Sequence, residues 1–113
     1  MNSKRKRHRK LDPAILEDII CRIVHVAKPQ TIILFGSAAR GDMGPNSDLD
    51  LLVVKPGRYN RRKLAQRIYM GMEGAGEAVD VIVVTPEDVK RYRSTPWLVI
   101  AGALKEGRIV YAA

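Results

Sequence analysis

The amino-acid sequence predicts one α/β or α+β domain built around a single small β-sheet. Three short runs of β-branched and other apolar residues predict strands at Thr31–Phe35, Leu49–Val54 and Val79–Val84. Segments with apolar residues at helical spacing precede, separate and follow these strands. Alternation of strands and helices is typical of a sheet flanked by helices. No internal repeat or domain boundary interrupts residues 11–113, which we expect to form one domain.

Helical periodicity and capping residues predict the first two helices. Asp12 and Pro13 mark the start of the first, as N-cap and first helical residue, and Pro29 marks its end. A second helix is expected over residues 59–72, after which glycines interrupt the pattern. Its core-facing residues are expected to be Leu64, Ala65, Ile68 and Met72.

The remaining segments are shorter. Thr85 is suited to cap a helix that continues to about residue 92, and Thr95 with Pro96 opens another that runs to Gly107. Residues 108–111 are expected to form an edge strand. Small and turn-forming residues dominate positions 36–47, so most of that stretch is expected to be loop.

The positive charge of the chain is concentrated at one end. The net charge is +8, but six of the 20 Lys and Arg residues lie in residues 1–10, which hold no acid, so the rest carries only +2. A run of like charges repels itself, so residues 1–10 are expected to be a disordered basic tail. Such a tail can also hold phosphates without sequence specificity, so a nucleic-acid contact stays open but is not favoured.

The composition also bears on the compartment. No apolar run approaches the ~20 residues needed to span a bilayer. No apolar signal-peptide core follows the charged first ten residues. The single Cys21 has no internal disulfide partner, which fits a reducing compartment. We therefore expect a cytoplasmic protein without a membrane segment.

Asp48 and Asp50 stand at the start of the second predicted strand. Side chains two residues apart on a strand point to the same face, so the two carboxylates should project together. They repel each other unless a cation lies between them, and Mg²⁺ takes carboxylate oxygens together with substrate phosphates. In sites with two metal ions, the ions stabilise the attacking and leaving oxygens of a displacement. The pair therefore predicts a Mg²⁺ site.

Asp80 is a further candidate metal ligand, on the third predicted strand. A lone carboxylate among β-forming residues is costly to bury unless it is paired or binds a metal. If this strand lies beside Leu49–Val54, Asp80 completes a cluster of three carboxylates. It would then be positioned to hold a metal ion and to accept a proton from the incoming nucleophile.

Gly36 and Ser37 directly follow the first predicted strand. A glycine there lets backbone N–H groups approach a phosphate closely. The Ser37 hydroxyl and the start of a short helix add further donors. No Gly-Lys-Ser/Thr follows, so the segment is not a Walker P-loop. We expect it to bind phosphate groups.

These residues carry a resemblance to a known family. Gly36-Ser37, ten further residues and Asp48-Leu49-Asp50 match the signature of the DNA polymerase β-like nucleotidyltransferase superfamily. Residues 34–42 and 47–53 are similar to its minimal nucleotidyltransferase (MNT) branch, and Asp80 falls where that branch has its third carboxylate. The resemblance runs from about the first helix to the C-terminus.

The resemblance implies the polymerase β-like fold, a small mixed β-sheet flanked by helices. It also implies a reaction in which a hydroxyl displaces pyrophosphate from a nucleoside triphosphate. By position, Asp48, Asp50 and Asp80 would hold two Mg²⁺ ions, with Asp80 also assisting the nucleophile. Gly36 and Ser37 would hold the triphosphate of ATP.

The MNT branch also implies a partner. Its members are often antitoxins that pair with a HEPN-domain ribonuclease toxin, and some attach AMP to a tyrosine of that toxin (AMPylation). We therefore expect a protein adenylyltransferase that forms a hetero-complex with a HEPN toxin. Two other functions stay open. The chain could be a non-catalytic antitoxin that masks its toxin, or a nucleotidyltransferase acting on RNA or a small hydroxyl compound, which the basic tail motivates.

Several residues also have purely structural readings. Asp48 could cap the turn after Ser47, and Arg40 could pair with Asp42. The run at 97–100 is expected to pack in the core. A solvated helix face would account for Arg61, Arg62, Lys63 and Arg67.

Overall fold

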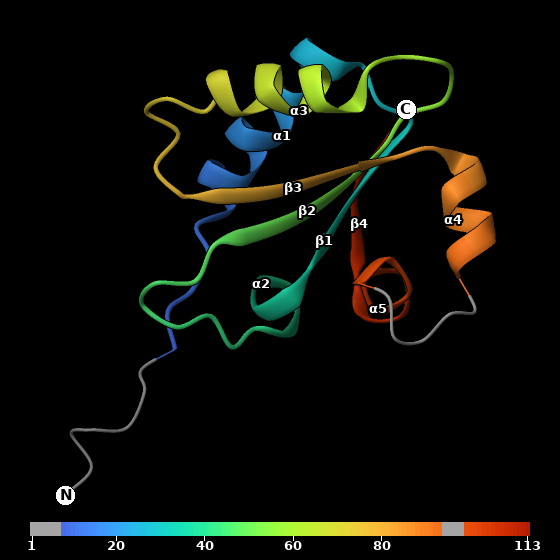
Figure 1. The fold of residues 1–113 in the computed structure, drawn as a ribbon. Coiled ribbons are helices and arrows are strands. Elements are labelled where there is room, and N and C mark those ends of the chain that lie inside the picture. The colour runs from blue at the N-terminus through green and yellow to red at the C-terminus, as the bar shows by residue number, and fades with distance from the viewer. Residues whose placement is uncertain (1–7, 94–98) are drawn as a thin grey trace, which may run out of the picture.

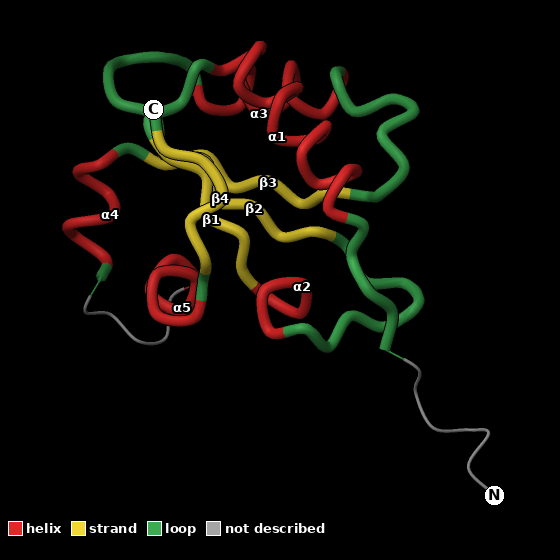
Figure 2. The backbone as a smooth tube through the Cα atoms, turned by 180° about the vertical axis from the view of Figure 1, so that it is seen from behind, coloured by secondary structure: helices red, strands yellow, loops and turns green. Residues whose placement is uncertain are grey.

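The computed structural model describes residues 8–93 and 99–113 of the chain. Within them a four-stranded sheet carries helices on both faces (Figures 1 and 2). The elements are α1 (Pro13–Ala27), β1 (Thr31–Phe35), α2 (Gly36–Arg40), β2 (Leu49–Val54), α3 (Arg61–Met70), β3 (Val79–Val84), α4 (Pro86–Tyr92), α5 (Val99–Glu106) and β4 (Arg108–Ala112). The predicted class, a small sheet flanked by helices, is confirmed.

The sheet is mixed and has the strand order β3-β2-β1-β4. β1 pairs antiparallel with both β2 and β4, whereas β2 and β3 run parallel. Parallel neighbours need a crossover connection, which α3 supplies. The two parallel strands therefore begin at the same end of the sheet, and this is the end that carries the predicted carboxylates.

Successive side chains along a strand point to opposite faces of the sheet, and helices cover both faces. Figure 1 shows α1 and α3 on one face and α2, α4 and α5 on the other. The larger buried cluster joins α1 and α3 to β1, β2 and β3, through Ile19, Ile23, Ile32, Leu34, Leu51, Val53, Leu64 and Ile68 among others. The smaller one comprises Ile33, Leu52, Val54, Val84 and Ala103. Asp50 and Asp80 share the alternation of Leu52 and Val84, so they lie on the second face.

The first helix begins as its sequence predicts. Asp12 Oδ1 accepts the Ala14 N–H at 2.9 Å, and Pro13 is the first helical residue. The cap satisfies one of the N–H groups that have no partner within the helix. The predicted N-cap Thr85 of α4 is also confirmed, and it forms a capping box in which Thr85 and Asp88 exchange side-chain and backbone hydrogen bonds.

Two elements differ from the sequence-based expectation. The helix expected over 59–72 is shorter, because Asn60 accepts the Lys63 N–H at 3.0 Å as its N-cap and Gly71 is the C-cap. Residues 36–40 form a short helix inside the stretch expected to be mostly loop, and Gly41 ends it in the left-handed region (φ 82°).

Some expectations concern residues that the structure does not describe. These are residues 1–7 of the basic tail, the start of the last helix at Thr95, and the core position of Trp97. At the end of the expected tail, the backbone N–H of Arg9 donates to the Met43 carbonyl at 2.9 Å. The chain therefore already contacts the domain at residue 9. No helix within the described ranges has both the length and the apolarity to cross a membrane.

Candidate functional site

Asp50 on β2 lies directly opposite Asp80 on β3 in the parallel register. Neighbouring strands are about 4.8 Å apart, and residues paired in this way project to the same face. The expectation that the strand of Asp80 lies beside Leu49–Val54 is therefore confirmed. The sheet brings together two carboxylates that are far apart in the sequence.

Asp48 lies one residue before β2 and is exposed. Its effect is visible at Asp50. Burial raises the pKa of Asp50 above its usual value, the charges of Asp80 and Asp48 raise it further, and Arg40 opposes them. Asp80 and Asp48 thus lie close enough to Asp50 for their negative charges to act on it. The site carries negative charge that Arg40 does not balance.

Gly36 supplies the space that Asp50 occupies. It follows Phe35, which is the β1 residue opposite Asp50, and its φ of 71° is in the region that favours glycine. A Cβ at this position would overlap Oδ2 of Asp50. Any larger residue would therefore displace the carboxylate. The structural reason for this glycine is its contact with Asp50, in addition to the phosphate contact expected from the sequence.

Ser37 lies in the first turn of α2, directly after Gly36 and at the same end of the sheet as Asp50. The N-cap residue of α2, Phe35, makes no side-chain hydrogen bond to the first turn. Backbone N–H groups at a helix start are good partners for phosphate oxygens. Gly36 and Ser37 are thus located where a bound triphosphate could meet the carboxylates.

Asp80 is exposed, which corrects part of the sequence argument. The predicted cost of burying its charge does not arise, because β3 is an edge strand and Asp80 stands near its beginning. Asp50, which is half-buried, does meet that cost. Exposure leaves the Asp80 carboxylate accessible to a molecule that approaches from solvent.

Tyr69 on α3 is a neighbour of the site that the sequence analysis missed. Its hydroxyl accepts the Val81 N–H at 2.7 Å and lies 3.3 Å from Oδ1 of Asp80, to which it can donate. Burial raises the pKa of Tyr69, and the charge of Asp80 adds to this effect. Eleven residues separate Tyr69 from Asp80, so no spacing in the sequence links them. The contact depends on how α3 returns along the outer edge of β3.

The carboxylate ligands of the site meet the requirements of a Mg²⁺ ion only in part in their present positions. No three His, Cys, Asp or Glu side chains within residues 8–93 and 99–113 are close enough together to hold a metal ion. Mg²⁺, however, usually takes one or two carboxylates and fills its other positions with water and phosphate oxygens. Asp50 with either neighbouring carboxylate satisfies that requirement, and the unbalanced negative charge favours a cation.

Other charged residues have the structural roles considered from the sequence. Arg40 pairs with Asp42 at 3.3 Å, as predicted, and also with Glu106 at 3.7 Å. On α3, Arg61 pairs with Asp88 at 2.6 Å. Consistent with a solvated helix face, the exposed residues there include Arg62, Lys63 and Arg67.

A hollow of about 970 Å³ lies away from the carboxylates. Its walls come from α4, α5 and β1, with Ile33, Val89 and Leu104 among them. None of the three aspartates lines it. This hollow is therefore separate from the candidate carboxylate site.

Comparison with known proteins identifies the family. The nucleotidyltransferase domain family matches residues 14–110, which include all three aspartates, Gly36 and Ser37. The chain belongs to this family. No curated protein matches it.

Solved structures share the fold. A protein of Sulfolobus solfataricus classed as a nucleotidyltransferase is 22% identical, with a TM-score of 0.60 over 88% of this chain and 78% of that one. A toxin–antitoxin structure with AMP-PNP is 21% identical, with a TM-score of 0.53 over 86% of this chain and 73% of that one. In a complex of tri-AMPylated HEPN toxin and MNT antitoxin from Shewanella oneidensis, the matching chain is 19% identical, with a TM-score of 0.50 over 88% of this chain and 72% of that one. At these identities the likeness establishes the nucleotidyltransferase fold.

Proposed function

We propose that this nucleotidyltransferase uses Mg²⁺ and ATP to transfer AMP to a hydroxyl group of a partner protein. The observation that carries the proposal is the register of the parallel strands, which sets Asp50 opposite Asp80. Asp48 precedes the same strand, and Gly36 leaves room for Asp50. The turn to which we assign phosphate binding thus lies against carboxylates whose charge is unbalanced.

In this proposal Asp48, Asp50 and Asp80 hold the metal, which we expect to be two Mg²⁺ ions. When bound, the ions would offset the charge of the triphosphate and stabilise the attacking and leaving oxygens. Gly36 and Ser37 would hold the triphosphate through backbone N–H groups and the Ser37 hydroxyl. This arrangement would present the α-phosphate to a hydroxyl that approaches from solvent.

The reaction joins the acceptor oxygen to the α-phosphorus of ATP. The bond from that phosphorus to the bridging oxygen of the β-phosphate breaks, and pyrophosphate leaves with its bonding electrons. The acceptor hydroxyl must lose its proton, and the exposed Asp80 carboxylate is the group we assign to accept it. Tyr69, 3.3 Å from Asp80 Oδ1, would orient that carboxylate.

The acceptor we propose is a tyrosine of a HEPN-domain toxin, so that the chain acts as an MNT-type antitoxin. Support comes from the shared fold with chains of toxin–antitoxin complexes, one containing AMP-PNP and one a tri-AMPylated HEPN toxin with its MNT antitoxin. The cytoplasm is the compartment we expect, since the exposed Cys21 is free.

The test is to incubate the chain with Mg²⁺, ATP labelled at the α-phosphate, and a HEPN-domain protein as acceptor. We expect label on that protein with the native chain and none with Asp48→Asn/Asp50→Asn. Glu17→Gln is a matched control, because Glu17 is an exposed carboxylate on α1, across the sheet from the site. It should label like the native chain.

Other results would point to the alternatives. If the partner binds but neither chain labels it, the function is masking of the toxin. If label appears on RNA in place of protein, the acceptor class is wrong although the transferase chemistry stands. Label that persists in Asp48→Asn/Asp50→Asn would contradict the site itself.

A further inference from the structure

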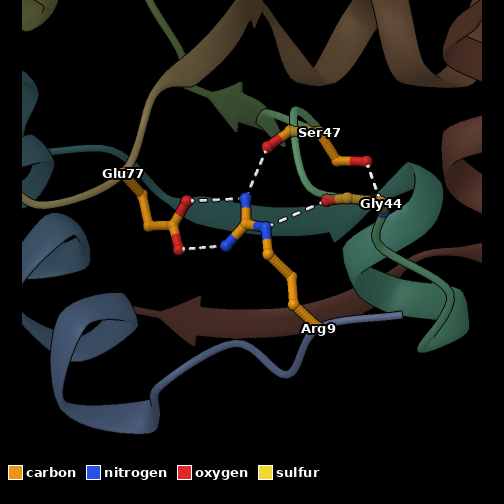
Figure 3. Close-up of polar contacts among 4 residues, drawn as sticks. All are labelled: Arg9, Gly44, Ser47 and Glu77. Carbon is orange, nitrogen blue, oxygen red and sulfur yellow. Dashed lines mark hydrogen bonds and ion pairs between the residues drawn. The ribbon is translucent and has the colours of Figure 1, made fainter. Parts of the chain in front are cut away.

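Arg9, at the end of the basic segment, joins two separate parts of the chain (Figure 3). Its Nη1 donates to Glu77 Oε2 at 2.6 Å and its Nη2 to Glu77 Oε1 at 2.9 Å. Its Nε donates to the Gly44 carbonyl at 2.9 Å, and Nη2 also donates to the Ser47 carbonyl at 2.7 Å. One guanidinium thus makes a bidentate ion pair and two backbone contacts.

The two parts joined are those that lead into the strands of the candidate site. Ser47 is the residue before Asp48, and the Gly44 N–H donates to its hydroxyl at 2.8 Å, which closes the loop on itself. Glu77 lies three residues before Asp80. Arg9 therefore contacts the backbone next to one proposed metal ligand and a side chain just before another.

The Arg9 contacts extend the β2·β3 pairing. The Leu49 N–H donates to the Ala78 carbonyl at 2.9 Å, one step before the register of the two strands begins. Immediately beyond this bond, Arg9 connects the Ser47 carbonyl to Glu77. It acts as one further cross-link between β2 and β3, made by a side chain from elsewhere in the sequence.

The environment of this cross-link makes it stronger than an ordinary surface pair. The side chain of Arg9 is 31% exposed and that of Glu77 only 12%. Bidentate, charge-assisted hydrogen bonds are short and fix both partners in one geometry. A lysine has the same charge but cannot reproduce the planar fork. The identity of residue 9, and not only its charge, therefore matters for the geometry of both loops.

We propose that Arg9 is a positioning residue that fixes the separation of Asp48 and Asp80 by clamping the loops before β2 and β3. The inference rests on the proposed function, because it assumes that these carboxylates bind the metal–nucleotide complex. Groups that orient metal ligands typically change metal affinity or activity about 10- to 100-fold when they are removed. Arg9 thus serves the site directly, although it belongs to the basic segment.

Arg22 provides a matched control. Its Nη1 donates to the Gly71 and Glu73 carbonyls at 2.9 and 2.8 Å, and its Nε pairs with Asp18 at 2.8 Å. It therefore anchors the same α3–β3 connection by the same kind of contact. Within the described part of the chain, Arg22 makes no hydrogen bond or ion pair with the loop before Asp48. Loss of Arg22 should loosen the fold without changing the distance between the carboxylates.

The test compares the native chain with Arg9→Lys, Glu77→Gln and Arg22→Gln. The first readout is the affinity for Mg·ATP without acceptor, measured by titration calorimetry; the second is kcat and KM for AMP transfer. We expect Arg9→Lys and Glu77→Gln each to weaken Mg·ATP binding and lower kcat by about 10-fold. The double variant should lose little more than either single one, since both break the same clamp. Arg22→Gln should keep native binding.

Thermal unfolding establishes that each variant is folded before its binding is judged. A folded Arg9→Lys chain with native Mg·ATP affinity would overturn the inference, as would an equal loss in Arg22→Gln. If the native chain transfers no AMP but Arg9→Lys still weakens Mg·ATP binding, the proposed function fails and the clamp stands. A native chain that binds no Mg·ATP would overturn both.

Discussion

The hydroxyl of Tyr69 on α3 lies 3.3 Å from Oδ1 of Asp80 on β3 while accepting the Val81 N–H at 2.7 Å. This places a hydrogen-bond donor beside the proposed proton acceptor, on the open edge of the sheet. Because the same oxygen also satisfies an edge-strand N–H, its position is fixed by the strand itself.

Tyr69→Phe removes both hydrogen bonds but keeps the ring. Loss of the hydroxyl should cost about 1–3 kcal/mol of unfolding free energy, because the N–H of the buried Val81 loses its partner. Without its donor, Asp80 should be less well oriented, so kcat for AMP transfer should fall several-fold with little change in KM. Urea unfolding and steady-state transfer assays measure the two effects. A native kcat in this variant would show that Tyr69 does not act on Asp80.

Gly36→Ala should abolish transfer because the added Cβ would overlap Oδ2 of Asp50. It should also destabilise the chain by about 1 kcal/mol or more, since φ is 71° at this residue. Gly74→Ala separates the two causes, because Gly74 has nearly the same φ, 76°, but nothing within 4 Å of its added Cβ. The control should lose stability and keep transfer. Equal loss of activity in both variants would assign the effect to backbone strain alone.

Asp50→Asn should stabilise the metal-free chain while eliminating transfer. Burial, Asp80 and Asp48 raise the pKa of Asp50, so the folded state binds its proton more tightly than the unfolded state does. This contribution favours folding below the unfolded pKa and is lost as pH rises through the folded one, which leaves a penalty at neutral pH. We expect a gain of roughly 0.5–1 kcal/mol at pH 7. Chemical unfolding without Mg²⁺ measures this gain in unfolding free energy. A loss of stability at pH 7 would contradict the raised pKa of Asp50.

The pKa of Asp88 is shifted in the opposite direction to that of Asp50. Burial alone would raise its pKa, but hydrogen bonds from the Thr85 N–H and the Arg61 guanidinium outweigh this, and the pKa is lowered. Its contribution to stability is therefore present above the usual Asp pKa of ~3.9 and is lost as pH falls through the lower folded value. Asp88→Asn should cost about 1 kcal/mol near pH 7, with the difference from the native chain shrinking in acid.

Unfolding free energies at several pH values below 7 test this dependence. Asp18→Asn is the control, because Asp18 pairs with Arg22 at 2.8 Å but its side chain is 51% exposed. An exposed pair contributes little, so that variant should stay close to the native chain throughout. If the difference in unfolding free energy between Asp88→Asn and the native chain does not vary with pH, the lowered pKa of Asp88 is contradicted.

Much of the fold could be predicted because its signals are local. The apolar runs predict the strands, and Asp12 and Thr85 predict helix starts by their own hydrogen-bonding chemistry. Asp48 and Asp50 could be paired because alternation along a strand fixes which side chains share a face, whereas grouping Asp80 with them required that its strand lie beside theirs. The family match covers residues 14–110, which include all three residues.

The features that could not be predicted depend on contacts between distant segments. Tyr69 meets Asp80 only because α3 returns along β3, and Arg9 meets Glu77 across 68 positions of sequence. No periodicity or spacing encodes either pair. Within the basic run at the N-terminus, no sequence signal distinguishes Arg9 from the other Lys and Arg residues.

The central claim is that the chain transfers the α-phosphoryl group of ATP, with its nucleoside, to a partner protein. The most direct measurement compares ATP labelled at the α-phosphate with ATP labelled at the γ-phosphate, using the native chain, Mg²⁺ and a HEPN-domain protein as acceptor. We predict label on the HEPN protein from the α-position alone, and none with Asp48→Asn/Asp50→Asn. Label from the γ-position, or α-label that survives loss of both carboxylates, would contradict the account.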